Sequence, residues 1–183
     1  MKRKQENPEE RNQPRTADRN RPLWKDLAAL IVKAGAAVLF VWLMFTFVYG
    51  ITKGDGMMAP SFRAGDLVFY YRLEKDLAEG DVVVYEREQE ESEYRIVAKE
   101  GDTVDVKNGS LTVNGYARDE TYLYGAETVA WENGIHFPVT VGEGEVFLLA
   151  DDRAEAVDSR IFGCVDRKEI KGKVILVLRR RSI

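Results

Sequence analysis

The sequence predicts a mainly β protein, an antiparallel β-domain preceded by one N-terminal transmembrane helix. Three observations support this prediction. Residues 34–51 carry no charged side chain, and from residue 66 onward short β-branched and aromatic runs alternate with Gly- and Asn-containing turns. No stretch beyond residue 51 has the apolar spacing of a long helix. The 183 residues are enough for one globular domain with an appendage.

The N-terminal part of the chain divides into a polar tail and an apolar span. Residues 1–26 are basic and polar without hydrophobic periodicity, so we expect a disordered cytoplasmic tail. Residues 27–51 are long enough to cross a hydrocarbon core of ~30 Å as a helix. Because the basic flank precedes the span, we expect a single pass through the plasma membrane with the N-terminus in the cytoplasm. Residues 52–183 would then form an extracytoplasmic domain.

A cleaved signal peptide is the alternative interpretation of the apolar segment. Such a peptide has a shorter apolar region, followed by a cleavage site of small residues. This segment is long and aromatic and ends in FVYGITKG. We therefore favour an uncleaved anchor.

Charge and composition exclude several function classes. Up to Ile51 there are nine basic and five acidic residues, which leaves 18 basic and 26 acidic residues beyond it. An acidic main domain argues against a nucleic-acid partner, since phosphate contacts dominate such binding. With one cysteine, Cys164, and one histidine, His136, no intramolecular disulfide can form. We expect a small buried cysteine, a surface histidine, no cofactor and no metal; Asp151, Asp152 and Asp158 do not have the usual calcium-loop spacing.

The β-domain is predicted from short strands and their turns. We expect strands at residues 66–71, 81–85, 94–98, 101–106, 145–149 and 173–178. Two Asn-Gly pairs within residues 108–117 predict a hairpin with tight turns. Residues 86–93 are acidic and are expected to form a solvated turn, and residues 119–134 an irregular insertion.

A constrained loop, residues 52–66, joins the apolar span to the first of these strands. Gly54 and Gly56 permit backbone conformations closed to other residues, and Pro60 fixes its own φ. Such a loop can present a binding or catalytic group rigidly.

Four segments together resemble the type I signal peptidases. MMAPSFRAGDLVFYY resembles their S-M-x-P-T-L-x-x-G-D-x-V box, and YRIVAKEGDTV their K-R-V-I-G-x-x-G-D-x-V box. NGSLTVNGYARDETYL is similar to the N-G-x-L-x-V-N-G segment, and LLADDRAEAVDSRIFGCV to the G-D-N-R-x-x-S-x-D-S-R-x-F-G-x-V box. The order and the preceding anchor match as well, and the resemblance covers residues 27–177.

The resemblance implies a membrane-anchored, signal-peptidase-like β-domain and a defined chemistry. Members of the family remove signal peptides from exported proteins with a Ser-Lys dyad. The serine hydroxyl attacks the scissile carbonyl, a desolvated neutral lysine takes its proton, and nearby backbone donors stabilise the oxyanion.

The dyad positions do not carry these residues. Counting back from Gly65 and Asp66, the serine position is Met57; counting back from Gly101 and Asp102, the lysine position is Tyr94. A thioether has no proton to lose, and a phenol is a poor base near neutrality. In the last box the serine position is Ala156. The resemblance implies that neighbouring polar residues brace the site, namely Asp151, Arg153, Asp158, Ser159 and Arg160.

Ser61 and Lys99 are the candidates for a relocated dyad, with Ser61 as the nucleophile and Lys99 as the base. Ser61 lies four residues beyond Met57, a shift of ~13 Å along a strand. Lys99 lies five residues beyond Tyr94, which also reverses the strand face. We expect a loop hydroxyl and a surface charge, with a relocated dyad as the alternative.

Two function classes follow, besides a purely structural tethered domain. One is an active signal peptidase using a relocated dyad. The other, which we favour, is a non-catalytic relative that keeps the peptide groove and binds an extended peptide. The groove residues that the resemblance implies are Asp55, Gly56, Met57, Met58, Pro60, Tyr94 and Arg95. The resemblance implies signal-peptide-bearing or pilin-like preproteins as ligands and a role in pilus assembly. A sortase or an active signal peptidase would be a candidate partner.

Overall fold

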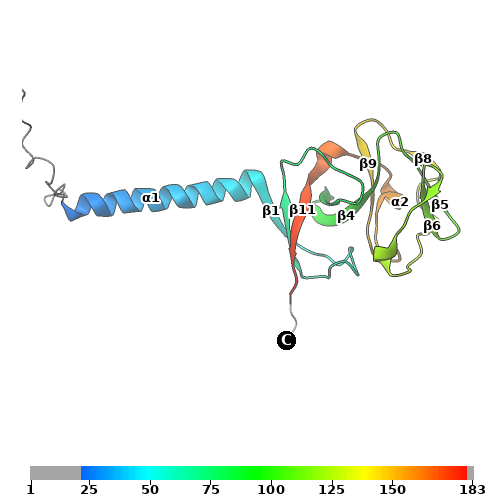
Figure 1. Ribbon diagram of the computed structural model, residues 1–183, viewed down its shortest axis with the longest axis horizontal. Coiled ribbons are helices and arrows are strands. Elements are labelled where there is room, and N and C mark those ends of the chain that lie inside the picture. Colours follow the sequence, from blue (N-terminus) through cyan, green and yellow to red (C-terminus); the bar gives the residue numbers. More distant parts are fainter. Residues whose placement is uncertain (1–21, 181–183) are drawn as a thin grey trace, which may run out of the picture. The chain divides into compact units, whose positions relative to one another are not determined.

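The computed structural model describes residues 22–180, and the chain divides into two compact units between Trp42 and Leu43. The predicted tail lies largely outside the described residues. Helix α1 (Leu23–Leu43) is followed by a π-helical turn, η2 (Met44–Val48) (Figure 1). Within residues 22–180, Leu23–Val48 is the one helical stretch long and apolar enough to cross a membrane, with a mean hydropathy of 2.3.

The boundaries of this helix differ from the predicted span of residues 27–51. The helix starts at Leu23, within the segment expected to be disordered, and Tyr49–Lys53 form strand β1 instead of the end of the span. Strand β1 pairs with Leu67–Tyr71, and Gly50 lies against the ring of Tyr70, where any larger side chain would collide. A continuous apolar run can form either a buried helix or a strand, and its hydrophobic pattern is the same in both. The sequence pattern therefore does not show where the helix ends and β1 begins.

The second unit contains two antiparallel sheets, which confirms the predicted mainly β fold. The smaller sheet lies at the end of this unit away from β1 and β11 (Figure 1). The larger sheet has the order β1-β2-β11-β3-β4-β9-β10, and the smaller has the order β7-β6-β5-β8. The bounds are β2 (Leu67–Tyr71), β3 (Val82–Arg87), β4 (Glu90–Lys99), β5 (Thr103–Lys107), β6 (Ser110–Val113), β7 (Tyr116–Ala117), β8 (Val139–Thr140), β9 (Glu145–Leu149), β10 (Val165–Asp166) and β11 (Ile170–Leu178).

The turns show where local sequence determines structure. Asn108-Gly109 and Asn114-Gly115 have positive φ at all four residues, as predicted for tight hairpins. The prediction of a solvated turn over residues 86–93 is wrong, because β3 and β4 continue through most of it. Only Glu88 and Gln89 turn, with φ of 55° and 72°. These two residues adopt the positive φ angles that are typical of an Asn-Gly turn, although neither is Asn or Gly.

The core positions the first half of β4 against the loop after β1. Tyr94, Ile96, Leu148 and Val83 lie in one buried cluster, against which Met57 packs. Short helical turns complete the unit. These are η3 (Thr121–Leu123), α2 (Ser159–Phe162) and η4 (Arg167–Glu169).

Candidate functional site

The loop between β1 and β2 is held in one conformation by its own backbone. Gly54 N–H donates to Asp66 O at 2.9 Å, and Gly65 N–H donates to Gly54 O at 2.8 Å. Gly56 has a φ of 103°, which favours glycine. Asp152 N–H donates to Met57 O at 2.8 Å, so the 151–157 segment fixes the residue at the family's serine position.

Met57 and Tyr94 come together in one groove. The cavity between them has a volume of about 300 Å³. Met57, Tyr94 and Val157 contribute apolar groups to it, whereas the β3–β4 hairpin contributes charged side chains. The lining residues are Met57, Arg87, Glu88, Glu90, Ser92, Tyr94 and Val157. The two residues predicted to occupy the dyad positions are therefore neighbours in the structure.

Tyr94 is a fixed, protonated aromatic residue. Its side chain is 3% exposed, and its ring meets Tyr85 and Phe162 edge-on, with centroids 6.1 and 6.0 Å away. The hydroxyl donates to Val157 O at 3.2 Å. Burial raises the pKa of Tyr94 to about 12, so the phenol keeps its proton near neutrality.

The Asp55 carboxylate accepts a hydrogen bond from the backbone N–H of Met57 at the same site. Its Oδ1 accepts a hydrogen bond from Met57 N–H at 2.8 Å. A backbone N–H at the nucleophile position is the kind of group that would stabilise an oxyanion. Here a carboxylate already accepts from it, and a second negative charge would be repelled. Asp55 was predicted as a groove residue, but this hydrogen bond could not be read from the sequence.

Glu93 is the residue at the site that sequence reasoning missed. It is fully buried, and within residues 22–180 neither carboxylate oxygen has a hydrogen-bond partner. Burial first, and then the charge of Asp55, raise the pKa of Glu93 to about 7. The backbone amides of Asp55 and Glu93 act in the opposite direction and lower this pKa in part. Neither amide is positioned to form a hydrogen bond with the carboxylate. The alternation of Glu91 and Glu93 in EESEY is the sign that the sequence offers, and the predicted solvated turn over residues 86–93 does not use it.

Three other predicted groove residues do not line the groove. Met58 is fully buried in a cluster with Phe62 and Val68, and Pro60 is exposed. Arg95 donates to both oxygens of Asp151, at 2.9 and 2.6 Å. None of Met58, Pro60 and Arg95 lines the groove.

Ser61 and Lys99 lie apart. The Ser61 hydroxyl donates to Asp151 Oδ2, and the same carboxylate is held by Arg95. Lys99 lies at the far end of β4, opposite Val146, four residues beyond Arg95 or ~13 Å along the strand. Within residues 22–180 no hydrogen bond joins Ser61 to Lys99.

Two buried arginines brace the loop that carries Ala156. Arg160 donates to both oxygens of Asp158, at 2.8 and 2.9 Å, and both side chains are fully buried. Arg153 donates to Ala150 O at 2.6 Å and pairs with Glu120. The Ser159 hydroxyl accepts from Leu148 N–H at 3.0 Å. These residues hold the 151–157 segment that in turn fixes Met57.

The remaining candidates lie outside this groove. Cys164 is half-buried, and burial raises the pKa of its thiol, while His136 is exposed. Among the described residues, no group of three or more His, Cys, Asp or Glu side chains could hold a metal ion.

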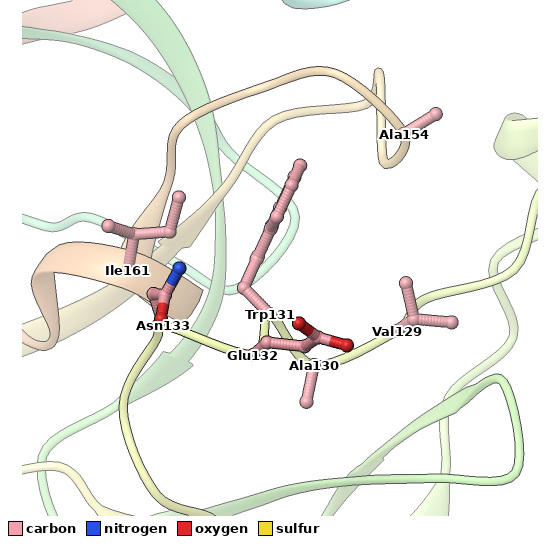
Figure 2. Close-up of a pocket in the computed structure, with 7 residues that line it drawn as sticks. All are labelled: Val129, Ala130, Trp131, Glu132, Asn133, Ala154 and Ile161. Atoms are coloured by element: carbon pink, nitrogen blue, oxygen red, sulfur yellow. The ribbon is translucent and has the colours of Figure 1, made fainter.

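A second pocket, of about 580 Å³, lies between the 129–133 segment and the loop that carries Ala154. Figure 2 shows the Trp131 ring extending toward this loop, with Ile161 of α2 beside it. It shares no lining residue with the Met57–Tyr94 groove.

Among the described residues, the edge of β4 beside the groove lacks a second strand. The first half of β4, Glu90 to Tyr94, pairs only with β3, because pairing with β9 starts at Arg95. Strand β1 is the edge of the larger sheet, and the loop after it reaches Glu93. An unpaired strand edge beside a groove is a place where an extended peptide can add.

These features define a class: an antiparallel β-domain that follows an apolar helix, with a groove between a rigid loop and a strand edge. The chain belongs to the signal peptidase family, since the family model described as "Signal peptidase, peptidase S26" matches residues 24–179. The resemblance drawn from the four sequence segments is thereby confirmed.

The chain is similar to several bacterial signal peptidases. It is 31% identical to signal peptidase I S of Bacillus subtilis (strain 168) over 148 residues, covering 74% of this chain and 80% of that protein. Identity to signal peptidase IB of Staphylococcus aureus (strain N315) is 28% over 173 residues, covering 82% and 88%. A crystal structure of a signal peptidase I from Enterococcus faecalis V583 matches 55% of this chain and 98% of its own, with a TM-score of 0.45 and 24% identity.

Proposed function

We propose that this protein is a membrane-anchored, peptide-binding member of the signal peptidase family that does not cleave its ligand. The observation that carries the proposal is the pairing of Met57 with Tyr94 in one groove, where the family has its dyad. The N-terminus would lie in the cytoplasm and the β-domain outside the plasma membrane.

Three requirements of the family's reaction are unmet by this groove. Met57 offers no nucleophilic oxygen. Tyr94, with a pKa of about 12, does not accept a proton near neutrality. Met57 N–H is engaged by the carboxylate of Asp55 instead of facing a developing oxyanion. Each loss alone would slow the reaction severely, and together they leave no route through these residues.

Ser61 offers no specific support for the alternative of an active peptidase. Its hydroxyl is held by Asp151, and Lys99 lies further along β4. A nucleophile needs a base within hydrogen-bond reach, and Ser61 has a carboxylate already paired with Arg95.

The groove retains what peptide binding requires. The unpaired edge of β4 would supply backbone donors and acceptors, and Met57, Tyr94 and Val157 supply apolar side chains. Met57 is flexible and polarizable and can adapt to a ligand side chain. The expected ligands are exported preproteins with signal peptides or pilin-like precursors. A role in pilus assembly beside a sortase or an active signal peptidase is part of the proposal and rests on the family resemblance alone.

Binding without cleavage tests the proposal. The full-length protein in detergent would be titrated against a fluorescein-labelled extended peptide of small apolar residues, with anisotropy reporting binding and mass spectrometry reporting the intact peptide. We expect saturable binding and no product. A Val157→Glu variant, which places a charge among these apolar side chains, should weaken binding about tenfold. Absence of saturable binding, or appearance of cleaved peptide, would overturn the proposal.

A further inference from the structure

In the part of the chain that the structure describes, Glu93 is a buried carboxyl that neither the fold nor the proposed function explains. A fully buried carboxyl without a hydrogen-bond partner is costly, and native proteins keep such groups rarely. It belongs to strand β4 directly beside Tyr94, on the unpaired edge beside the groove. Nothing in the family's reaction, or in binding of small apolar residues, uses a carboxyl there.

The surroundings of Glu93 are acidic. Asp55, from the loop after β1, is exposed and raises the pKa of Glu93 through its charge, and Glu91 of β4 acts in the same direction. Glu91 accepts from Tyr70 O–H of β2 at 3.1 Å, and the nearby cation, Arg72, lies over the Tyr70 ring at 4.9 Å. No ammonium or guanidinium group of residues 22–180 pairs with Glu93.

Strand geometry tells which ligand side chain would meet these carboxylates. Successive side chains of a strand point to opposite faces, so Glu91 and Glu93 share one face and Ser92 and Tyr94 the other. A peptide added along this half of β4 would therefore place alternate residues beside Met57 and Tyr94 and beside Asp55 and Glu93. The first set meets apolar side chains, and the second meets two carboxylates.

We propose that the unpaired edge of β4 beside the groove recognises a basic side chain of the ligand, a lysine or an arginine, through Asp55 and Glu93 on the strand face opposite Tyr94. This inference rests on the proposed function and adds the chemical class of the ligand. The cation reaches exposed Asp55 first, and the Asp55 side chain, held by one hydrogen bond to Met57 N–H, turns to admit the cation to Glu93. Bound there, the cation supplies the missing partner of Glu93 and separates two like charges.

Two probes that differ in one side chain test the inference. One is a fluorescein-labelled peptide of alternating alanine and threonine with a central lysine; the other has norleucine in place of the lysine. With full-length protein in non-ionic detergent at about pH 8, where Glu93 is ionised, the lysine peptide should bind about tenfold more tightly. The preference should shrink toward about pH 6, as protons compete with the lysine for Glu93.

Variants separate Glu93 from the general acidity of the groove. Glu93→Gln should remove most of the preference by weakening the lysine peptide about tenfold, with the norleucine peptide unchanged. Glu143→Gln, which changes the net charge equally at an exposed residue that does not line the groove, should keep the preference. Glu93→Met, of similar volume, provides a second test if the buried amide impairs folding, which thermal unfolding would reveal.

The outcomes distinguish the inference from the proposed function. If both peptides bind equally to the wild-type protein, or if Glu93→Gln keeps the lysine preference, the inference is wrong and peptide binding stands. If neither peptide binds, the proposed function fails, and the inference fails with it.

Discussion

At the scale of single residues, Glu93 should make stability depend on pH. Its pKa is about 7 in the folded protein against 4.5 ordinarily, so the folded state holds the proton more tightly than the unfolded state. Stability from this group is therefore complete below the ordinary pKa and is lost as pH rises through about 7. We predict that Glu93→Gln removes a pH-dependent loss of about 2 kcal/mol, the pKa difference being discounted for solvent screening.

Unfolding of the detergent-solubilised protein at about pH 5 and about pH 8 measures this difference. Glu90→Gln is the matched control, because Glu90 is exposed and should leave the pH dependence unchanged. An identical pH dependence in the wild-type protein and Glu93→Gln would show that Glu93 does not titrate in this range.

The buried pair of Asp158 and Arg160 should be far more important than exposed ion pairs. Asp158→Asn leaves the Arg160 guanidinium buried without a counter-charge, which should cost about 3 kcal/mol. The comparison is Lys168→Ala, which removes an exposed partner of Asp166 and should cost less than about 1 kcal/mol. Thermal unfolding of both variants tests this order, and equal losses would contradict it.

At the scale of elements, the β3–β4 turn is locally strained. Glu88 and Gln89 both have positive φ, a conformation that Asn-Gly adopts at lower cost. We predict that Glu88→Asn with Gln89→Gly stabilises the protein by roughly 1 kcal/mol. Gly115→Ala should do the reverse by about 1 kcal/mol, since its φ is 81° and no atom lies near enough to clash.

Chemical unfolding midpoints of the two turn variants give the measurement. A destabilised Asn-Gly variant would mean that Glu88 or Gln89 makes contacts that outweigh their backbone cost. Because both residues lie beside the groove, peptide binding by the same variant would also report whether the hairpin is adjustable.

The same turn shows why local sequence predicted some elements and missed others. The two Asn-Gly turns and the β-branched runs that became β2, β3 and β9 carry their conformational preference within a few residues. Residues 86–93 do not, because their strands form through pairing of β3 with β4, and the acidic side chains follow. Strand β1 was hidden in an apolar run for the same reason, since it is defined by pairing with β2.

At the scale of the whole molecule, the family framework could be predicted and the site only in part. Four spaced segments identified the family, and they predict that Met57 and Tyr94 occupy its dyad positions. That these two residues share a groove depends on how the loop folds onto β4. The hydrogen bond from Met57 N–H to Asp55 arises from that same packing, as does the burial of the Glu93 carboxylate without a hydrogen-bond partner among the described residues. The sequence shows only the alternation of Glu91 and Glu93; it shows neither this hydrogen bond nor the burial of Glu93.

Restoring the chemistry should require three changes rather than two. Met57→Ser supplies a nucleophile and Tyr94→Lys a base in a desolvated position. Asp55→Ala then releases the backbone donor at residue 57 and removes a charge that opposes the oxyanion. We predict that the triple variant cleaves at least about tenfold faster than the double variant.

The most direct measurement is cleavage of a fluorogenic signal-peptide substrate by the full-length wild-type protein in detergent, with the double and triple variants alongside. We predict no cleavage by the wild type and measurable cleavage by the triple variant, as expected of a preserved groove that lacks its catalytic groups. Cleavage by the wild type that disappears in Ser61→Ala or Lys99→Ala would contradict this, and would mean that the dyad has moved rather than been lost.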